Sequence, residues 1–406
     1  MSFRLFLTLI FCTRAAWAAS LPLSIEGAAD YALKHNPTLA AARFRIEEAR
    51  GRLQQSGRLS NPELELDSTR NLRSREGSIG ITLMQRFPVT ERLRYEKAVS
   101  RAEVAAAEAE VRDVERKLAA EVRAAAVRVL AIEAQRELRS TQLANSRELA
   151  GFLVKRVEVG EASVVDASQV ELETRQIEIE SLQLAAEQVA LIGSLRPLLG
   201  FSGDGGIKIT GALPGTAAPP ALKGIANRPD IQAAEYRAEA AAAAVLQQRS
   251  NRWQDIGVGA SYSLERSKDE PDPIETEQIA GLKISIPLPV WNDNAGRIRE
   301  AEAAAARAAK EAGATKLTAR SEENSARSEM AALAKLIGEL DSAVLPKAEQ
   351  IEELLRSNYA AGLTPLPEVL RARTRRLELQ RLRLDALRDY QLARIRQNAA
   401  VLNSSK

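Results

Sequence analysis

The pattern of apolar and polar positions separates the chain into long helical stretches and short alternating segments. Long stretches with few Gly or Pro residues, rich in Ala, Glu, Arg, Leu and Gln, are typical of helices. We predict helices at residues 24–34, 38–55, 91–157, 164–195, 229–248, 296–359 and 368–402. Apolar residues instead recur at every second position, as in strands, at residues 63–68, 78–85, 256–264 and 279–286. The chain is therefore predicted to be mainly α with a small β part.

The same order of elements occurs twice, about 200 residues apart. Three landmarks have echoes at offsets of 192, 201 and 202 residues: Asn36-Pro37 with Arg228-Pro229, Phe87-Pro88-Val89 with Leu288-Pro289-Val290, and Arg156 to Gly160 with Asn358 to Gly362. Repeats of 20–50 residues would indicate a solenoid. A period this long indicates a duplicated helix–strand–strand–helix–helix module.

Each copy contains one very long helix that ends at a glycine turn. Residues 91–157 contain no Pro and only one Gly, so this helix would be roughly 100 Å long. It breaks at Val159-Gly160, and its counterpart at residues 296–359 breaks at Gly362. We expect this second helix to be kinked near Gly338 and Pro346.

Four segments follow from these boundaries. Residues 1–18 are predicted to be a signal peptide, residues 19–201 the first repeat, residues 202–226 a linker rich in Gly, Pro and Ala, and residues 227–406 the second repeat. In the leader, Arg4 precedes a short apolar run and Ala16-Trp17-Ala18 forms a small-x-small cleavage site. The only cysteine, Cys12, lies inside the leader after Phe11, which argues against lipid attachment.

Composition excludes several classes of function. The mature chain has no cysteine, which excludes disulfides, thiolate metal sites and cysteine nucleophiles. The 57 Lys and Arg residues nearly balance the 54 Asp and Glu residues, and loss of Arg4 and Arg14 with the leader brings the counts closer, so no nucleic-acid footprint is expected. The only histidine, His35, stands at a helix break without other ligands around it. We expect no catalytic residues, no metal site and no cofactor.

The alternating segments are long enough to cross a bilayer when tilted, with one face toward lipid and the other toward a polar lumen. Four strands cannot close a barrel, and open edges in lipid leave backbone groups unsatisfied. Three chains would supply twelve strands, enough to enclose a passage. The Ala-rich helices point the same way, because runs such as Ala105 to Ala107 and Ala303 to Ala306 allow close packing between helices.

Several segments resemble the TolC family of outer membrane efflux proteins across essentially the whole mature chain. The opening from Ala28 to Pro37, the segment from Gly57 to Leu64 and the proline-rich segment from Ile286 to Gly296 carry the resemblance. The last of these is similar to the branch that serves heavy-metal cation pumps of the resistance-nodulation-division class. The resemblance implies a homotrimer in outer membrane lipid, with a twelve-stranded β-barrel continued by a periplasmic α-helical barrel.

The resemblance also implies a function for the two helix–turn–helix tips, which in the family meet a periplasmic adaptor protein. The matching residues are Arg156, Val159, Gly160, Tyr359, Ala361, Gly362 and Leu363. A periplasmic gate is expected beside them, at Asp166, Thr364, Glu368 and Arg371. Asp166 and Glu368 match acidic positions of the family, whereas Thr364 and Arg371 depart from the pattern. We therefore expect a gate that differs in detail.

These observations favour the exit channel of a tripartite efflux pump, serving an adaptor and an inner membrane pump and possessing no enzymatic activity. An exit duct for type I protein secretion would share the fold and differ only in its partner. A periplasmic coiled-coil structural or adaptor protein is the alternative from another class. An adaptor, however, should carry a lipoyl-like β-domain between its helical arms, and no such segment is found.

Overall fold

The computed structural model describes residues 21–400 except 74–75, 204, 218–224, 226 and 268–274. The predicted signal peptide at residues 1–18 lies outside the described residues. Within the described chain, no helix combines the length and apolar character that a membrane-crossing helix needs. The chain forms two compact units, which interleave along the sequence. We call them the helical unit (Met1–Thr38, Glu115–Leu222 and Glu322–Lys406) and the sheet unit (Leu39–Val114 and Lys223–Ser321).

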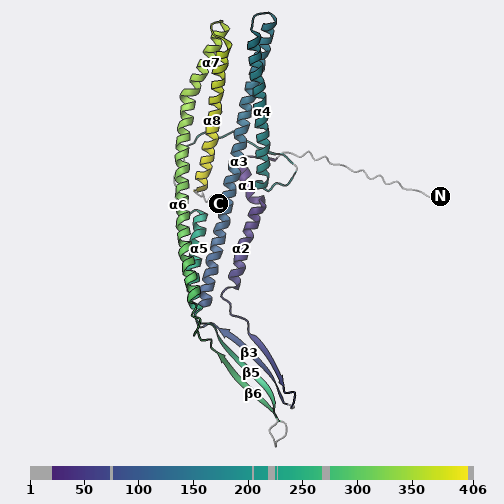
Figure 1. The fold of residues 1–406 in the computed structure, drawn as a ribbon, viewed down its shortest axis with the longest axis vertical. Helices are drawn as coiled ribbons and strands as arrows, with labels where there is room; N and C mark the ends of the chain where they lie inside the picture. Colours follow the sequence, from purple (N-terminus) through teal and green to yellow (C-terminus); the bar gives the residue numbers. More distant parts are fainter. Residues whose placement is uncertain are drawn as a thin grey trace, which may run out of the picture. The chain divides into compact units, whose positions relative to one another are not determined.

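The helical unit is built around two hairpins of long helices (Figure 1). The first hairpin joins the end of α3 (Arg92–Glu158) to α4 (Val164–Leu199). The second joins the end of α6 (Ala295–Glu339), the π-helical segment η1 (Leu340–Val344) and α7 (Leu345–Ala360) to α8 (Leu366–Ala400). The short helix α1 (Ile25–His35) contributes three buried alanines, Ala28, Ala29 and Ala32.

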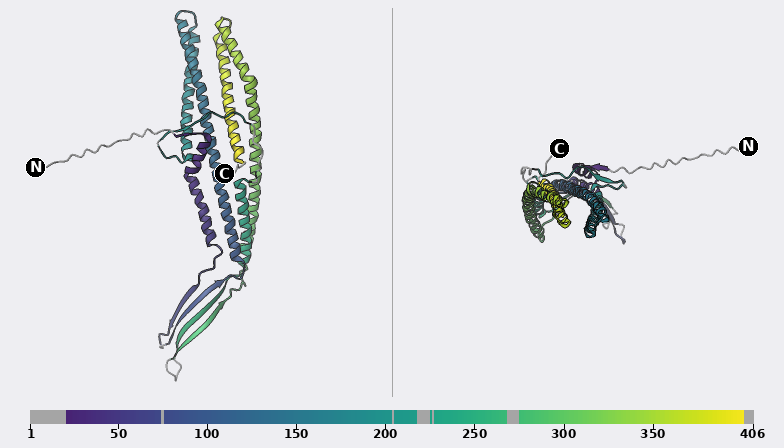
Figure 2. Two further views of the ribbon diagram at one scale, coloured as in Figure 1. Left: turned by 180° about the vertical axis from the view of Figure 1, so that it is seen from behind. Right: turned by 90° about the horizontal axis from the view of Figure 1, so that it is seen from above.

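Within the helical unit, contacts place the helices in the order α7, α8, α3, α4. Arg376 of α8 forms an ion pair with Glu352 of α7. Gln135 of α3 donates to Asp385 of α8 at 2.9 Å. Arg139 of α3 forms an ion pair with Glu180 of α4 at 2.7 Å. Figure 2, in the view from above, shows these helices set along a curve rather than around a central core, so α4 and α7 are its two flanks.

The register of the second hairpin changes at η1, where the α-helix widens into one π-helical turn. The predicted kinks near Gly338 and Pro346 bracket this segment. Asp341 of η1 accepts two hydrogen bonds from the guanidinium of Arg383 on α8. The hydroxyl of Ser342 donates to the carbonyl of Gly338 at 2.8 Å. The π-helical turn is therefore linked to α8 by Arg383, and the hydroxyl of Ser342 supplies a hydrogen bond to the carbonyl of Gly338 beside it.

Two short parallel strands, β1 (Leu21–Leu23) and β4 (Ile207–Ile209), were not predicted, and β4 lies within the predicted linker. Helix α4 ends at Leu199, four residues beyond the predicted end at residue 195, and Gly200 caps it in the left-handed conformation. A Cβ at Gly200 would lie 2.2 Å from the carbonyl oxygen of His35. This close approach lets α1 pack against α4, and only glycine permits it.

Part of the predicted linker after β4 contacts the helices. Leu213 packs against the cluster of Met330, Leu387 and Tyr390 that joins α6 to α8. The side chain of Gln391 donates to the carbonyls of Pro214 and Gly215 at 3.0 and 2.7 Å.

The sheet unit contains one four-stranded antiparallel sheet in the order β2-β3-β5-β6. The strands are β2 (Glu63–Arg70), β3 (Gly77–Phe87), β5 (Ile256–Ser267) and β6 (Glu275–Ser285). The four predicted strands are present, and β5 and β6 extend into what was predicted as loop. Hairpins join β2 to β3 and β5 to β6, while β3 and β5 pair across the two repeats.

Helices α2 (Pro37–Gln55) and α5 (Pro229–Ser250) complete the sheet unit beside the first parts of α3 and α6. Small residues form the buried contacts, among them Ala49, Ala106, Ala240 and Ala312. Ion pairs cross between the helices around them: Arg50 with Glu108, Arg237 with Glu110, Arg249 with Glu302, and Lys316 with Glu235. Close-packed alanine with charged flanks explains why the helices need no large apolar core.

Candidate functional site: the hairpin tips and the two-faced sheet

The first hairpin turns at a capped helix end. Gly160 has a φ of 75°, and its N–H donates to the carbonyl of Val157 at 3.0 Å. The N–H of Glu161 reaches back to the carbonyl of Arg156 at 2.8 Å. Together these bonds form a Schellman motif, which satisfies the last carbonyls of α3. Ser163 then caps α4 by accepting from the N–H of Val165 at 3.1 Å.

The second hairpin turns in the same way. Gly362 has a φ of 73°, and its N–H donates to the carbonyl of Tyr359 at 3.0 Å. The N–H of Leu363 reaches the carbonyl of Asn358 at 2.9 Å. No atom lies within 4 Å of a Cβ built at Gly160 or at Gly362, so glycine is required for its backbone conformation and not for space.

The two tips share one apolar cluster. Leu153 and Val170 of the first hairpin and Leu366 of the second are almost fully buried. Tyr359 and Leu370 pack against them. The structure therefore brings the two predicted tip regions together, and Tyr359 is part of this packing.

The outer ends of both tips are exposed. Val159 is 68% exposed and Leu363 is 77% exposed, while Gly160, Ala361 and Gly362 are exposed beside them. Arg156 is half-buried, with its guanidinium in contact with both Phe152 and Glu161. Its guanidinium lies 5.6 Å from the centre of the Phe152 ring and 3.3 Å from the carboxylate of Glu161.

A buried polar layer lies behind the tip cluster, and sequence reasoning missed it. The hydroxyl of Thr174 donates to that of Ser146 at 3.0 Å, which joins α4 to α3. Arg373 of α8 is 8% exposed and donates to the carbonyl of Gln142 at 3.2 Å. Burial raises the pKa of Glu173, although the nearby Arg373 acts in the opposite direction. In the sequence these residues are indistinguishable from the many charged positions of the helix surfaces.

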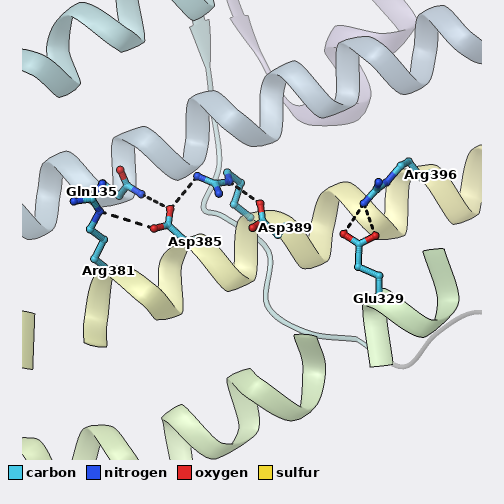
Figure 3. A network of polar contacts seen from close by, with 7 residues as sticks. Gln135, Glu329, Arg381, Asp385, Asp389 and Arg396 are labelled. Atoms are coloured by element: carbon cyan, nitrogen blue, oxygen red, sulfur yellow. Dashed lines mark hydrogen bonds and ion pairs between the residues drawn. The ribbon is translucent and has the colours of Figure 1, made fainter. Parts of the chain in front are cut away.

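Farther along α8, a second polar network ties the two hairpins together (Figure 3). The side chain of Gln135 points from α3 to Asp385, which also accepts from Arg388 at 2.9 Å and faces Arg381. The guanidinium of Arg396 donates to both carboxylate oxygens of Glu329 at 2.8 Å, which joins α8 to α6. The acidic and basic residues that alternate along α8 therefore help to hold α8 against α3 and α6.

The sheet has one apolar and one polar face, because paired residues of neighbouring strands point to the same side. The exposed apolar face carries Leu64, Leu66, Ile79, Ile81, Leu83, Val258, Tyr262, Leu264, Leu282 and Ile284. The other face carries Glu63, Glu65, Asp67, Thr82, Arg86, Ser261, Ser263, Lys283 and Ser285. The outer edges of β2 and β6 have no partner within the described chain.

The family profile described as "Outer membrane efflux protein" matches residues 28–200 and 223–401. These two segments include both hairpins and all four strands of the sheet. The chain belongs to the outer membrane efflux protein family. This family member is therefore an outer membrane protein that extends into the periplasm, from a family of channels. The proposed resemblance to TolC-like channels is confirmed.

Solved structures show the same fold for this family member. A structure of CusC has a TM-score of 0.78 at 20% identity, covering 93% of this chain and 91% of that one. A membrane protein from Pseudomonas aeruginosa has a TM-score of 0.79 at 20% identity, with 93% of each chain covered. The outer membrane protein VceC from Vibrio cholerae has a TM-score of 0.73 at 22% identity, covering 93% and 95%. A search of curated protein sequences returns no significant match.

The residues predicted to form a gate lie around the tips of this family member. Glu368 and Arg371 are exposed on the first turns of α8, and no ion pair joins them within the described residues. Thr364 is half-buried in the turn before α8, and Asp166 is half-buried in the first turn of α4. The described residues contain no group of three or more potential metal ligands.

Proposed function

We propose that this protein forms a trimeric exit channel that passively conducts substrates of a tripartite efflux pump from the periplasm to the exterior. The observation that carries the proposal is the two-faced sheet with open edges. An exposed face with ten large apolar residues suits lipid, and a polar face behind it suits a water-filled lumen. Backbone groups at the edges of β2 and β6 require a partner in a bilayer.

Closure by three copies follows from this sheet. Eight strands from two chains would leave an interior filled by side chains, whereas twelve strands leave room for passage. Pairing the edge of β2 with the edge of β6 from the next copy closes the sheet without any free edge. The homotrimer is therefore the smallest assembly that satisfies every strand and also conducts.

The flanking helices of the helical unit support the same assembly. On α4, exposed apolar residues recur along one side: Leu172, Ile179, Leu182 and Val189. On the opposite flank, Val344 lies at the end of η1, and Ile351 and Leu354 on α7. Apolar residues spaced by seven positions are typical of helices that pack against a partner. We propose that α4 of one copy packs against α7 of the next, extending the barrel as a helical wall.

The partners are proposed to be a periplasmic adaptor and an inner membrane pump of the resistance-nodulation-division class. The exposed outer ends of the tips, with Val159 and Leu363 at their centres, offer the adaptor an apolar contact. Heavy-metal cations are the proposed substrates, because the sequence from Ile286 to Gly296 resembles the branch of the family that serves heavy-metal cation pumps.

Purified protein in planar lipid bilayers tests the proposal. We expect stepwise ionic currents, and native mass spectrometry of the same sample in detergent should report three chains. A stable monomer that retains its β-signal would contradict the closure argument. Deletion of the gene should lower resistance to the pump's substrates, and restoring the wild-type gene should recover it.

A further inference from the structure

A polar cleft of about 590 Å³ lies in the sheet unit where β3, β5 and β6 meet the helices. The segment between α5 and β5 contributes Arg252, and the start of α6 contributes Arg297. The end of β3 and the start of α3 contribute Arg86 and Arg92. The cleft thus gathers four arginines from three separate parts of the sequence.

Two of these four arginines have their charges matched by acids. Arg92 forms an ion pair with Asp255 at 2.8 Å. Arg86 forms an ion pair with Glu63 at 3.1 Å. Arg252 and Arg297 have no ion pair with any described residue, and both are exposed toward solvent. The cleft therefore has two guanidinium groups available for a ligand.

The sheet side of the cleft belongs to the polar face. Met84, Arg86, Gly257 and Ser285 line it, and the last three are paired across β3, β5 and β6. A Cβ at the buried Gly257 would lie 3.0 Å from the sulfur of Met84 and 3.4 Å from the Cβ of Ser285. Glycine at this position keeps the floor of the cleft open.

Charge changes sign along this face. Glu65 is paired with Thr82 and Asp67 with Gly80, farther along the strands from the cleft. Glu265 of β5 and Glu277 of β6 are paired near the ends of these strands opposite the cleft. The polar face is therefore basic where the strands meet the helices and acidic toward the opposite end. The arginines of the cleft therefore stand at the less acidic end of the polar face.

We propose that this cleft binds an anionic group, a carboxylate or a phosphate, of a solute passing through the channel. Planar guanidinium groups bind such groups through two parallel hydrogen bonds, and Arg252 and Arg297 supply them. The inference rests on the proposed function, because the polar face lines a lumen only in an assembled channel. It names anionic solutes, or cations carried with anionic ligands, as the substrate class.

Titration calorimetry of the detergent-solubilised full chain with inorganic phosphate tests the site. The double variant Arg252→Gln and Arg297→Gln should weaken phosphate binding by at least about tenfold. Arg299→Gln is the matched control, because Arg299 is exposed on the same helix outside the cleft. The control should bind as wild type does. Equal phosphate affinity in wild type and the double variant, or no binding by wild type, would overturn the proposal.

A second comparison separates a soluble anion from a lipid headgroup. Phosphate binding is measured in nanodiscs of phosphatidylcholine and in nanodiscs containing phosphatidylglycerol. We expect equal affinities, because the cleft opens on the polar face. If phosphatidylglycerol abolishes phosphate binding, the site is occupied by lipid and the proposal of a solute site fails.

Bilayer currents distinguish failure of this inference from failure of the proposed function. In wild-type channels, phosphate should reduce the chloride current, and the double variant should lose this block while keeping its conductance in potassium chloride. Conductance without any phosphate effect would refute the anion site and leave the channel function standing. Absence of current would refute the channel function, and calorimetry would then decide the site by itself.

Discussion

The guanidinium of Arg373 donates to the main-chain oxygen of Gln142 at 3.2 Å, which joins α8 to α3 across 231 positions of sequence. Arg373 is almost fully buried, and its charge acts on the pKa of Glu173 on α4. A buried guanidinium needs compensation, and here the carbonyl dipole of Gln142 supplies part of it. The three helices α3, α4 and α8 therefore share one polar contact close behind the tips.

We predict that Glu173→Gln makes stability less dependent on pH. Burial raises the pKa of this carboxyl in the folded state, the nearby Arg373 lowering it by less. The protonated Glu173 side chain therefore contributes its full share of stability below the unfolded pKa of about 4.3. This contribution is lost as the pH rises through the raised pKa of the folded state. The variant should match wild type at low pH and be more stable than wild type near neutral pH. Thermal unfolding followed by circular dichroism measures both.

Glu171→Gln is the control for that measurement. Glu171 lies exposed two residues earlier on the same helix. Its replacement should leave the pH dependence of wild type in place. If Glu173→Gln retains the full wild-type dependence, burial of this carboxyl is not what shapes the stability profile.

Valine at either tip glycine should impair coupling to the adaptor without affecting assembly. Gly160 and Gly362 both have positive φ, which costs other residues roughly 1–2 kcal/mol. The strain is confined to an exposed turn, so trimer yield and outer membrane location should stay close to wild type. Efflux-dependent resistance should fall strongly.

Gly151→Val provides a comparison for the tip variants, since Gly151 is exposed in the regular part of α3. It should retain most of the resistance. Cross-linking to the adaptor in cells reports the contact itself, and wild-type cross-linking in both tip variants would exclude the tips as the docking surface.

Glu368→Lys is expected to change ion preference. Glu368 is exposed on the first turn of α8, and three copies around a trimer axis would form a ring of negative charge that attracts cations. Reversal should lower the cation preference of single channels and leave adaptor cross-linking intact. Unchanged selectivity would show that Glu368 does not face the lumen.

Arginine on the apolar face of the sheet should be far more damaging than arginine on the polar face. Leu282→Arg introduces a charge on the proposed lipid face, at a cost of about 2–4 kcal/mol near the middle of a bilayer. Ser261→Arg, on the other face of β5, should be tolerated. Heat-resistant trimer on gels after outer membrane extraction compares the two. Equal yields would contradict the assignment of the faces.

Most of the fold could be predicted because its signals are local. Alternation of Ile79, Ile81 and Leu83 identifies a strand, and a glycine after a long uninterrupted stretch identifies a helix end. Strands β1 and β4 could not be predicted, because three residues are too few to show a period and their pairing joins Leu21 to Ile207. The close contact of Gly200 with His35 depends on the tertiary structure alone.

The candidate site was predicted less completely, because several of its contacts depend on tertiary structure and leave no local signal in the sequence. The tip glycines could be predicted directly, because a glycine that follows a long helical stretch indicates a helix end with positive φ. Arg373 and Glu173 look like any other charged residues of a helix surface, and only the packing of α8 against α3 and α4 buries Arg373 and half-buries Glu173. Arg252 and Arg297 line one cleft only in the folded chain, where β5 pairs with β6, and the sequence of neither segment contains that pairing.

The π-helical turn at Leu340–Val344 is a difference between the two copies, because α3 is a regular α-helix from Arg92 to Glu158. A π-helical turn accommodates one extra residue within an α-helix. The second hairpin therefore holds one more residue than a regular α-helix of the same length would hold. Removing one residue from this segment should restore a regular helix, and the protein should tolerate that deletion better than a deletion from the matching stretch of α3.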